Sequence, residues 1–294
     1  MDTLRAILLM VLSMALLAAS DAFLKLASQH APVGQVMLML SIGATLLFVV
    51  LARLRRVSLN LADAFHRKVM LRNIFEMVGA LGMIVGLSKI PLSLMAAIMQ
   101  TAPLVVTLGA ALFLGEPVGW RRWLAIAVGL VGMLMVIRPG GSGFTGWEIV
   151  PVAGVTGLAA RDLVTRVLPQ RIPSIAVSAY GFAAVFPLGL AVLLVTGTPL
   201  VAEPPVFLHM AGAVVVTAAG YLAVTTAMRM APVSAVAPFR YTRLVFTAGL
   251  GMAVFGERPD GWTWAGAALI LGAGLYSFLR ERRLARQQLA VLRP

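Results

Sequence analysis

ASDAFLKLASQHAP at residues 19–32 and ARDLVTRVLPQRIP at residues 160–173 are the two stretches that decide the fold of this 294-residue chain. Each comes at the end of a long apolar run, and an offset of 141 residues relates them. Applied without a gap to residues 19–116 and 160–257, this offset aligns Asp21 with Asp162, Gln29 with Gln170, Pro32 with Pro173, Gly79 with Gly220, Pro91 with Pro232, Ser93 with Ser234, and Gly115-Glu116 with Gly256-Glu257. A repeat of this length, built from apolar runs, indicates a transporter made of two related helical bundles.

The composition is that of a membrane protein. Hydrophobic residues make up 60% of the chain and charged residues 12%, and the mean hydropathy is +0.95. Because a hydrocarbon layer of about 30 Å needs roughly 20 apolar residues per helix, the apolar runs predict an all-α integral membrane protein. Ten transmembrane spans are expected, at residues 4–27, 33–54, 69–87, 91–114, 120–137, 147–168, 174–196, 206–230, 232–255 and 262–279.

Each half holds five spans, an odd number, so the second half enters the membrane from the opposite side and the repeats are inverted. Arginine and lysine cluster in segments that share the side of the N-terminus under this topology, such as residues 53–68 and 280–293. Since short cytoplasmic loops accumulate positive charge, both termini are predicted to be cytoplasmic in a multi-pass protein of a bacterial inner membrane. The expected organisation is a single membrane domain at 1–294, with a first repeat at 1–138, a second repeat at 147–281 and a basic cytoplasmic tail at 282–294.

The sequence offers little for catalysis or cofactor binding. Cysteine is absent, which excludes disulfides and thiolate metal sites, and His30, His66 and His209 stand apart in the chain. We therefore expect no enzyme activity, no metal site and no cofactor. The net charge of +13 is placed as membrane orientation requires, so no nucleic-acid partner is expected. The expected partners are a small-molecule substrate and the lipid bilayer, and a chain that holds both repeats is expected to act as a monomer.

Charged residues inside the spans are candidates for function, because charge within a membrane usually faces a cavity or a partner. Three acid–base pairs are spaced four residues apart and can neutralise themselves: Asp21 with Lys25, Arg72 with Glu76, and Asp162 with Arg166. Lys25 and Arg166 lie near span ends, where they can also extend to the interface. Asp21, Glu76 and Asp162 are candidates for carrying a coupled proton or for balancing arginine.

Two arginines of the ninth span have no acidic residue nearby in the sequence. Arg240 and Arg243 follow Pro232 by 8 and 11 residues, which at the rise of a helix is roughly 12 to 17 Å. This depth is near the middle of the membrane, where two cations need anions. The counter-ions are either internal, such as Glu76 or Asp21, or a carboxylate of the substrate.

The centres of the fourth and ninth spans carry proline and polar residues. Pro103 and Pro238 each remove a backbone hydrogen bond, so they are candidates for a helix break used in gating, or for packing kinks. Gln100 and Tyr241 are repeat equivalents, each nine residues after the proline that opens its span. Residues in this relation can meet across the pseudo-two-fold axis, so both are candidates for shaping a midplane site.

The eighth span adds Thr217 and Tyr221, which share one helical face and either complete a cavity wall or pack against neighbouring helices. In this scheme Arg240 or Arg243 would hold a substrate carboxylate and Glu76 would hold an ammonium group, with Asp21 as the alternative. The candidate substrate-binding residues are therefore Gln100, Tyr241, Arg240, Arg243, Glu76, Tyr221 and Thr217.

The ends of the fourth and ninth spans carry a recognisable combination of residues. Leu114-Gly115-Glu116-Pro117 is followed by Trp120 and a glycine-bearing helix ending in Ile137-Arg138-Pro139-Gly140, and Phe255-Gly256-Glu257-Arg258 is followed by Trp262. Together with Asp21-Ala22-Phe23-Leu24-Lys25, these residues make nearly the whole chain resemble EamA-type members of the drug/metabolite transporter superfamily. The resemblance implies ten helices in a 5+5 inverted repeat and export of small metabolites, and amino-acid exporters of the YddG type are similar in length and plan. Glu116 and Glu257 are expected to fix helix-to-loop junctions.

These observations predict a secondary transporter that exports amino acids or similar small zwitterionic metabolites by alternating access around a midplane cavity. The alternative is an exporter of amphipathic drugs or nucleoside-like metabolites, which would rely on methionine and phenylalanine linings. An intramembrane enzyme or a non-transporting subunit is a third possibility from a different class.

Overall fold

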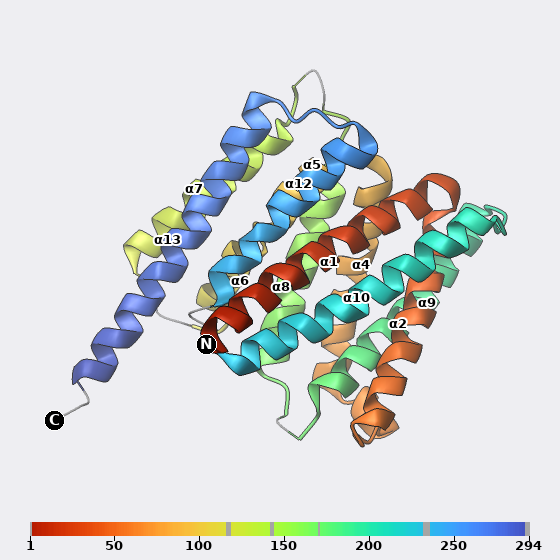
Figure 1. Ribbon diagram of the computed structural model, residues 1–294, viewed down its shortest axis with the longest axis horizontal. Helices are drawn as coiled ribbons and strands as arrows, with labels where there is room; N and C mark the ends of the chain where they lie inside the picture. Colours follow the sequence, from red (N-terminus) through yellow and green to blue (C-terminus); the bar gives the residue numbers. More distant parts are fainter. Residues whose placement is uncertain (1, 116–118, 142–143, 170, 232–235, 292–294) are drawn as a thin grey trace.

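The computed structural model describes residues 2–115, 119–141, 144–169, 171–231 and 236–291, and every regular element in these ranges is helical. Figure 1 shows a bundle of long helices. In chain order the elements are α1 (Asp2–His30), α2 (Val33–Leu54), α3 (Leu61–Ala64), α4 (Arg67–Lys89), α5 (Leu92–Met99), α6 (Ala102–Phe113), α7 (Trp120–Ile137), α8 (Ile149–Arg166), α9 (Ser174–Thr196), α10 (Pro204–Met230), the 3-10 helix η1 (Ala237–Tyr241), α12 (Thr242–Phe255) and α13 (Gly261–Val291).

Eight segments of the described chain are long and apolar enough to cross a membrane. Helices occur at all ten predicted positions, but two of them do not meet this measure. α8 carries three charged residues within 18 residues, and α12 is only 14 residues long because η1 precedes it. The chain is therefore an all-helical integral membrane protein with eight clear spans, and the count of ten stays a prediction.

The fourth predicted span is divided near its centre, and the described part of the ninth begins as a 3-10 helix. α5 ends at Met99, and α6 begins at Ala102 with Pro103 in its first turn. In the second half, Pro238 lies in the first turn of η1, which leads directly into α12. Because proline lacks an N–H group, it fits the first turn of a helix and disrupts a helix interior. The helix boundaries thus lie where the two prolines indicated a break, and any role in gating stays a prediction.

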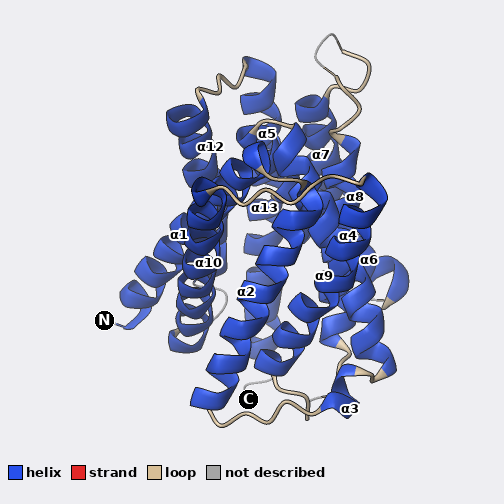
Figure 2. Cartoon of the chain, turned by 90° about the vertical axis from the view of Figure 1, so that its right-hand side faces the viewer, coloured by secondary structure: helices blue, strands red, loops and turns tan. Residues whose placement is uncertain are grey.

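The principal helix pairs are α1 with α10, α4 with α8, α2 with α9, and α7 with α13. The pairing follows the repeat: the first long helix of each half packs against the third long helix of the other half, which gives α1 with α10 and α8 with α4. Glycines allow the close approaches: a Cβ atom on Gly82 of α4 would lie 2.4 Å from the Cα atom of Gly154 on α8. Figure 2 shows the start of α1 and the end of α13 toward the end of the bundle that holds α3. The opposite end, which holds the connections after α1, α4, α7, α9 and α12, is called the distal end below.

Candidate functional site

A chain of charged residues joins α4 to α8 inside the bundle. The two carboxylate oxygens of Glu76 bind different arginines, with Arg72 at 2.5 Å and Arg161 at 3.0 Å. Arg161 also donates to Asp162 at 2.7 Å, so one guanidinium bridges two carboxylates. Arg72 is buried and packs against Gly181 of α9, where a Cβ atom would collide with its guanidinium. The spacing of Arg72 and Glu76 predicted their pairing, but it gave no indication of Arg161.

A second ion pair links α1 to α12. Arg243 donates to both carboxylate oxygens of Asp21, at 2.8 and 2.7 Å, and a third contact measures 3.2 Å. The local pairing of Asp21 with Lys25 suggested by their spacing does not form. Lys25 instead donates to the carbonyls of Leu87 and Ile90 at the end of α4. A lysine is favoured there because the last carbonyls of a helix carry partial negative charge.

Arg240 differs from the other interior arginines because its side chain is exposed and, within the described ranges, makes no hydrogen bond or ion pair. Its strongest charged neighbours are Asp162 and Arg161 on α8, together with Arg243. Asp162 is itself open, with 49% of its side chain exposed, whereas the Glu76 side chain is 13% exposed. An exposed cation of η1 and a half-exposed carboxylate of α8 thus lie within electrostatic range of each other.

Gln100 and Tyr241 meet as their symmetric positions suggested, although not through both side chains. The Gln100 amide Nε2 donates to the backbone carbonyl of Tyr241 at 3.4 Å. The Tyr241 hydroxyl instead lies against Gly274 of α13, at a place where a Cβ atom would be 1.9 Å away. Gln100 also borders an enclosed cavity of about 10 Å³ beside Asp21 and Arg243, about the room of one water molecule. The backbone carbonyl of Tyr241 thus accepts a hydrogen bond from Gln100, while its ring packs against α13.

Thr217 and Tyr221 attach α10 to two different helices. The hydroxyl of Thr217 lies 2.6 Å from that of Ser20 on α1. The Tyr221 hydroxyl lies 3.1 Å from that of Ser178 on α9, and its ring packs edge-on against Phe48. These contacts give both residues a packing role between helices.

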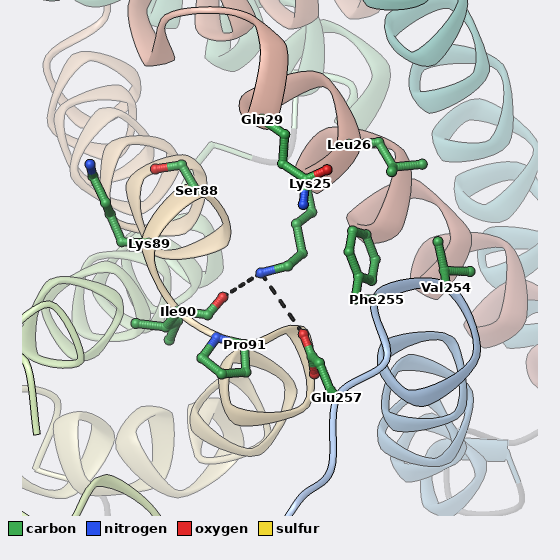
Figure 3. A pocket seen from close by; sticks show the side chains of 10 residues that line it. All are labelled: Lys25, Leu26, Gln29, Ser88, Lys89, Ile90, Pro91, Val254, Phe255 and Glu257. Carbon is green, nitrogen blue, oxygen red and sulfur yellow. Dashed lines mark hydrogen bonds and ion pairs between the residues drawn. The ribbon is translucent and has the colours of Figure 1, made fainter. Parts of the chain in front are cut away.

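The distal end contains a pocket of about 480 Å³ that opens to the outside. Figure 3 shows that Lys25 of α1 points across it toward Glu257, which follows α12. Their charged atoms are 3.9 Å apart. Glu257 was expected to fix a helix-to-loop junction, but the pairing with Lys25 was not foreseen. The sequence feature that pointed to Glu257 was the Gly-Glu dipeptide repeated in both halves. The glutamate of the other copy, Glu116, lies outside the described residues.

Comparison with known proteins gives a consistent result over most of the chain. The family model described as the EamA-like transporter family matches residues 4–138 and again residues 146–279. A riboflavin transporter of Rhizobium johnstonii is 32% identical over 219 residues, which cover 74% of this chain and 71% of that protein. An S-adenosylmethionine uptake transporter of Rickettsia bellii is 26% identical over 219 residues, 72% of each protein.

Two further matches extend over more of the chain. The pseudopaline exporter CntI of Pseudomonas aeruginosa is 28% identical over 278 residues, which cover 91% of this chain and 93% of that protein. A solved structure described as the crystal structure of a protein covers 95% of this chain and 98% of its own, with a TM-score of 0.64 at 17% identity. At this identity the likeness shows the fold.

Proposed function

Because the chain belongs to the EamA-like transporter family of the drug/metabolite transporter superfamily, we propose that it exports amino acids or similar small zwitterionic metabolites by alternating access. The protein is a multi-pass inner membrane transporter, and this part of the conclusion follows from the family and the apolar helices. The substrate class and the direction of transport are our proposal. They depend on the charges inside the bundle.

The free charge of Arg240 is the observation that carries the proposal. The interior network contains four arginines and three carboxylates, which leaves one positive charge: Arg72, Arg161, Arg240 and Arg243 against Asp21, Glu76 and Asp162. Arg243 is held at both carboxylate oxygens of Asp21, so the uncompensated cation is Arg240. A substrate carboxylate would pair with Arg240 directly. A zwitterion leaves the net charge of the network unchanged, so this pairing is local to Arg240.

An ammonium group of the same substrate has one accessible partner in this region. Glu76 and Asp21, the sequence-based candidates, each have both oxygens bound by arginine. Asp162 uses its Oδ1 atom for Arg161 and remains half-exposed. We therefore assign the ammonium group to Asp162 and the carboxylate to Arg240, which places the two ends of a zwitterion between α8 and η1.

The names of the relatives support a second candidate substrate. Riboflavin and S-adenosylmethionine, named for two of them, both combine an aromatic ring system with polar groups. Riboflavin has no carboxylate, so its transport would not depend on the free charge of Arg240, whereas S-adenosylmethionine carries an amino-acid group and would respond as an amino acid does. The two candidates are separated by the variant described next.

The test is uptake into proteoliposomes that are preloaded with unlabelled substrate, using labelled amino acids, S-adenosylmethionine and riboflavin. Arg240→Gln should raise the KM for a carboxylate substrate by about 10-fold or more, because a hydrogen bond to a charged group contributes about 1.5–3 kcal/mol. Arg53→Gln, a change of an exposed arginine in the last turn of α2, should leave KM unchanged.

An amide analogue of the same amino acid completes the design. It lacks the carboxylate, so its weaker transport should not respond to Arg240→Gln. Equal KM values for wild type and Arg240→Gln with every carboxylate substrate would refute the assignment. Transport of riboflavin alone, unaffected by Arg240→Gln, would favour the second candidate.

A further inference from the structure

The chain turns back on itself directly after α12. Gly256 adopts a left-handed conformation with φ of 64°, which is favourable for glycine. The next N–H group, of Glu257, donates to the carbonyl of Gly251 at 3.1 Å. This turn places the Glu257 carboxylate against Gly251, where a Cβ atom would lie 2.6 Å from its Oε2 atom. The absence of a side chain at residue 251 therefore makes room for the folded-back carboxylate.

Glu257 caps a helix of the other half of the protein. Its Oε2 atom accepts from the N–H of Ser93 at 2.8 Å and from the hydroxyl of Ser93 at 2.7 Å, and its Oε1 atom accepts from the N–H of Leu92. These groups form the first turn of α5, whose own N-cap residue, Pro91, provides no side-chain hydrogen bond. A carboxylate is favoured at this position because it satisfies free N–H groups at the positive end of the helix.

Lys25 extends the same cluster to α1. It lies 3.9 Å from the Glu257 Oε1 atom, and it donates to the carbonyls of Ile90 at 2.5 Å and Leu87 at 3.2 Å. One set of contacts thus joins α1, the connection from α4 to α5, and the end of α12 (Figure 3). We call the contacts of Lys25, Glu257, Leu92 and Ser93 the distal latch.

Two spaces of different size lie beside the distal latch, the first lined by Lys25 and Glu257 and the second by Leu92. On its outer side is the open pocket of about 480 Å³, which includes Gln29, Ser88 and Phe255 in its lining. On its inner side is the enclosed cavity of about 10 Å³, bordered by Met99 and Gln100. α5 borders this cavity along its length, from Leu92 in the first turn, which Glu257 holds, to Gln100 at its C-cap.

We propose that Glu257 is a positioning residue for transport, which closes the distal end by holding the first turn of α5 and must release it when that end opens. This inference rests on alternating access, a part of the proposed function, but not on the identity of the substrate. Glu257 acts through α5 on Gln100, and it does not touch the substrate.

The lack of cysteine in the chain makes a direct test possible. Single cysteines are introduced as Met99→Cys below the latch and as Ser88→Cys above it, and their reaction with a membrane-impermeant thiol reagent is measured in cells and in inside-out vesicles. Ser88→Cys marks the side of the membrane on which the distal end lies. On that side, Glu257→Gln should accelerate labelling of Met99→Cys by about 10-fold or more, because charged hydrogen bonds to α5 are lost. Labelling of Ser88→Cys should not change.

A matched pair of glycine variants tests the latch without removing its carboxylate. Gly251→Ala displaces Glu257 and should also accelerate labelling of Met99→Cys. Gly249→Ala, two residues earlier on α12, meets no atom within 4 Å and should behave as wild type. Folding of each variant is checked by gel filtration in detergent.

The outcomes separate the latch from the proposed substrate. Unchanged labelling of Met99→Cys in folded Glu257→Gln and Gly251→Ala proteins would overturn the inference, even if amino acids are transported. Faster labelling supports it even if the transported substrate proves to be a flavin. Equal acceleration by Gly249→Ala would also overturn it, because the effect would then not depend on Glu257.

Discussion

Removing the carboxylate of Asp21 should destabilise the protein much more than breaking an ion pair at its surface. The Asp21 side chain is 9% exposed and that of its partner Arg243 is 25% exposed. Loss of one member of a buried pair leaves an uncompensated charge and costs about 3–5 kcal/mol. Since Arg243 is partly accessible, we expect the lower end, about 3 kcal/mol, for Asp21→Asn.

The matched control is the pair of Arg138 and Asp260 at the distal end, where the side chains are 46% and 42% exposed. Exposed pairs contribute about 0–1 kcal/mol, so Arg138→Gln should have a small effect. Thermal unfolding in detergent provides the comparison. With roughly 2–4 °C per kcal/mol, Asp21→Asn should lower Tm by about 6 °C or more, and Arg138→Gln by no more than about 4 °C.

A double variant tests the physical reason. Asp21→Leu combined with Arg243→Met removes both charges, and replacing a buried ion pair by apolar residues is often neutral or stabilising. The double variant should therefore be more stable than Asp21→Leu alone. If Asp21→Asn lowered Tm no more than Arg138→Gln, or if the double variant were less stable than the single one, the argument from an uncompensated charge would be refuted.

Two further predictions concern packing and pH. Gly274→Ala should destabilise the protein by about 1–3 kcal/mol because its Cβ atom collides with Tyr241, whereas Gly272→Ala, with no atom within 4 Å, should be neutral or slightly stabilising in thermal unfolding. Hydrogen bonds from Thr263, the main cause, and then Arg138 lower the pKa of Asp260 in the folded protein. A carboxylate whose pKa is lowered by folding stabilises the folded protein above the ordinary aspartate pKa of about 4, and this stabilisation is lost as the pH falls through the lowered pKa. Asp260→Asn should therefore make Tm less dependent on pH in the acidic range. An unaltered slope of Tm against pH would contradict the assignment.

The features that could be predicted from the sequence are those set by composition and by local spacing. Apolar runs indicated an all-helical membrane protein, and the spacing of Arg72 and Glu76 indicated their ion pair. The repeat brought together Gln100 and Tyr241, because equivalent positions near a two-fold axis are neighbours.

The features that could not be predicted depend on which helices touch. Asp21 and Arg243 are 222 residues apart, and nothing in the spacing of either half favours their contact over the local one with Lys25. The direction in which a side chain points could not be predicted from the sequence either. Tyr241 lies at the expected depth, but its ring follows the space left by Gly274 on α13 and not the axis of the bundle. Helix rotation and glycine placement decide such contacts, and neither can be read from one chain without its packing partners.

Asp21 and Lys25 of α1 show how local and tertiary pairing lead to different mechanical properties. If Asp21 and Lys25 bound each other, α1 would carry a self-contained ion pair and could move freely past α12. In the structure Asp21 binds Arg243 in α12, and Lys25 approaches Glu257 beyond its end. The inner pair has two short hydrogen bonds, whereas the outer pair is separated by 3.9 Å. Opening of the distal end should therefore break the outer contact first, with α1 and α12 still joined at Asp21 and Arg243, next to the residues assigned to the substrate.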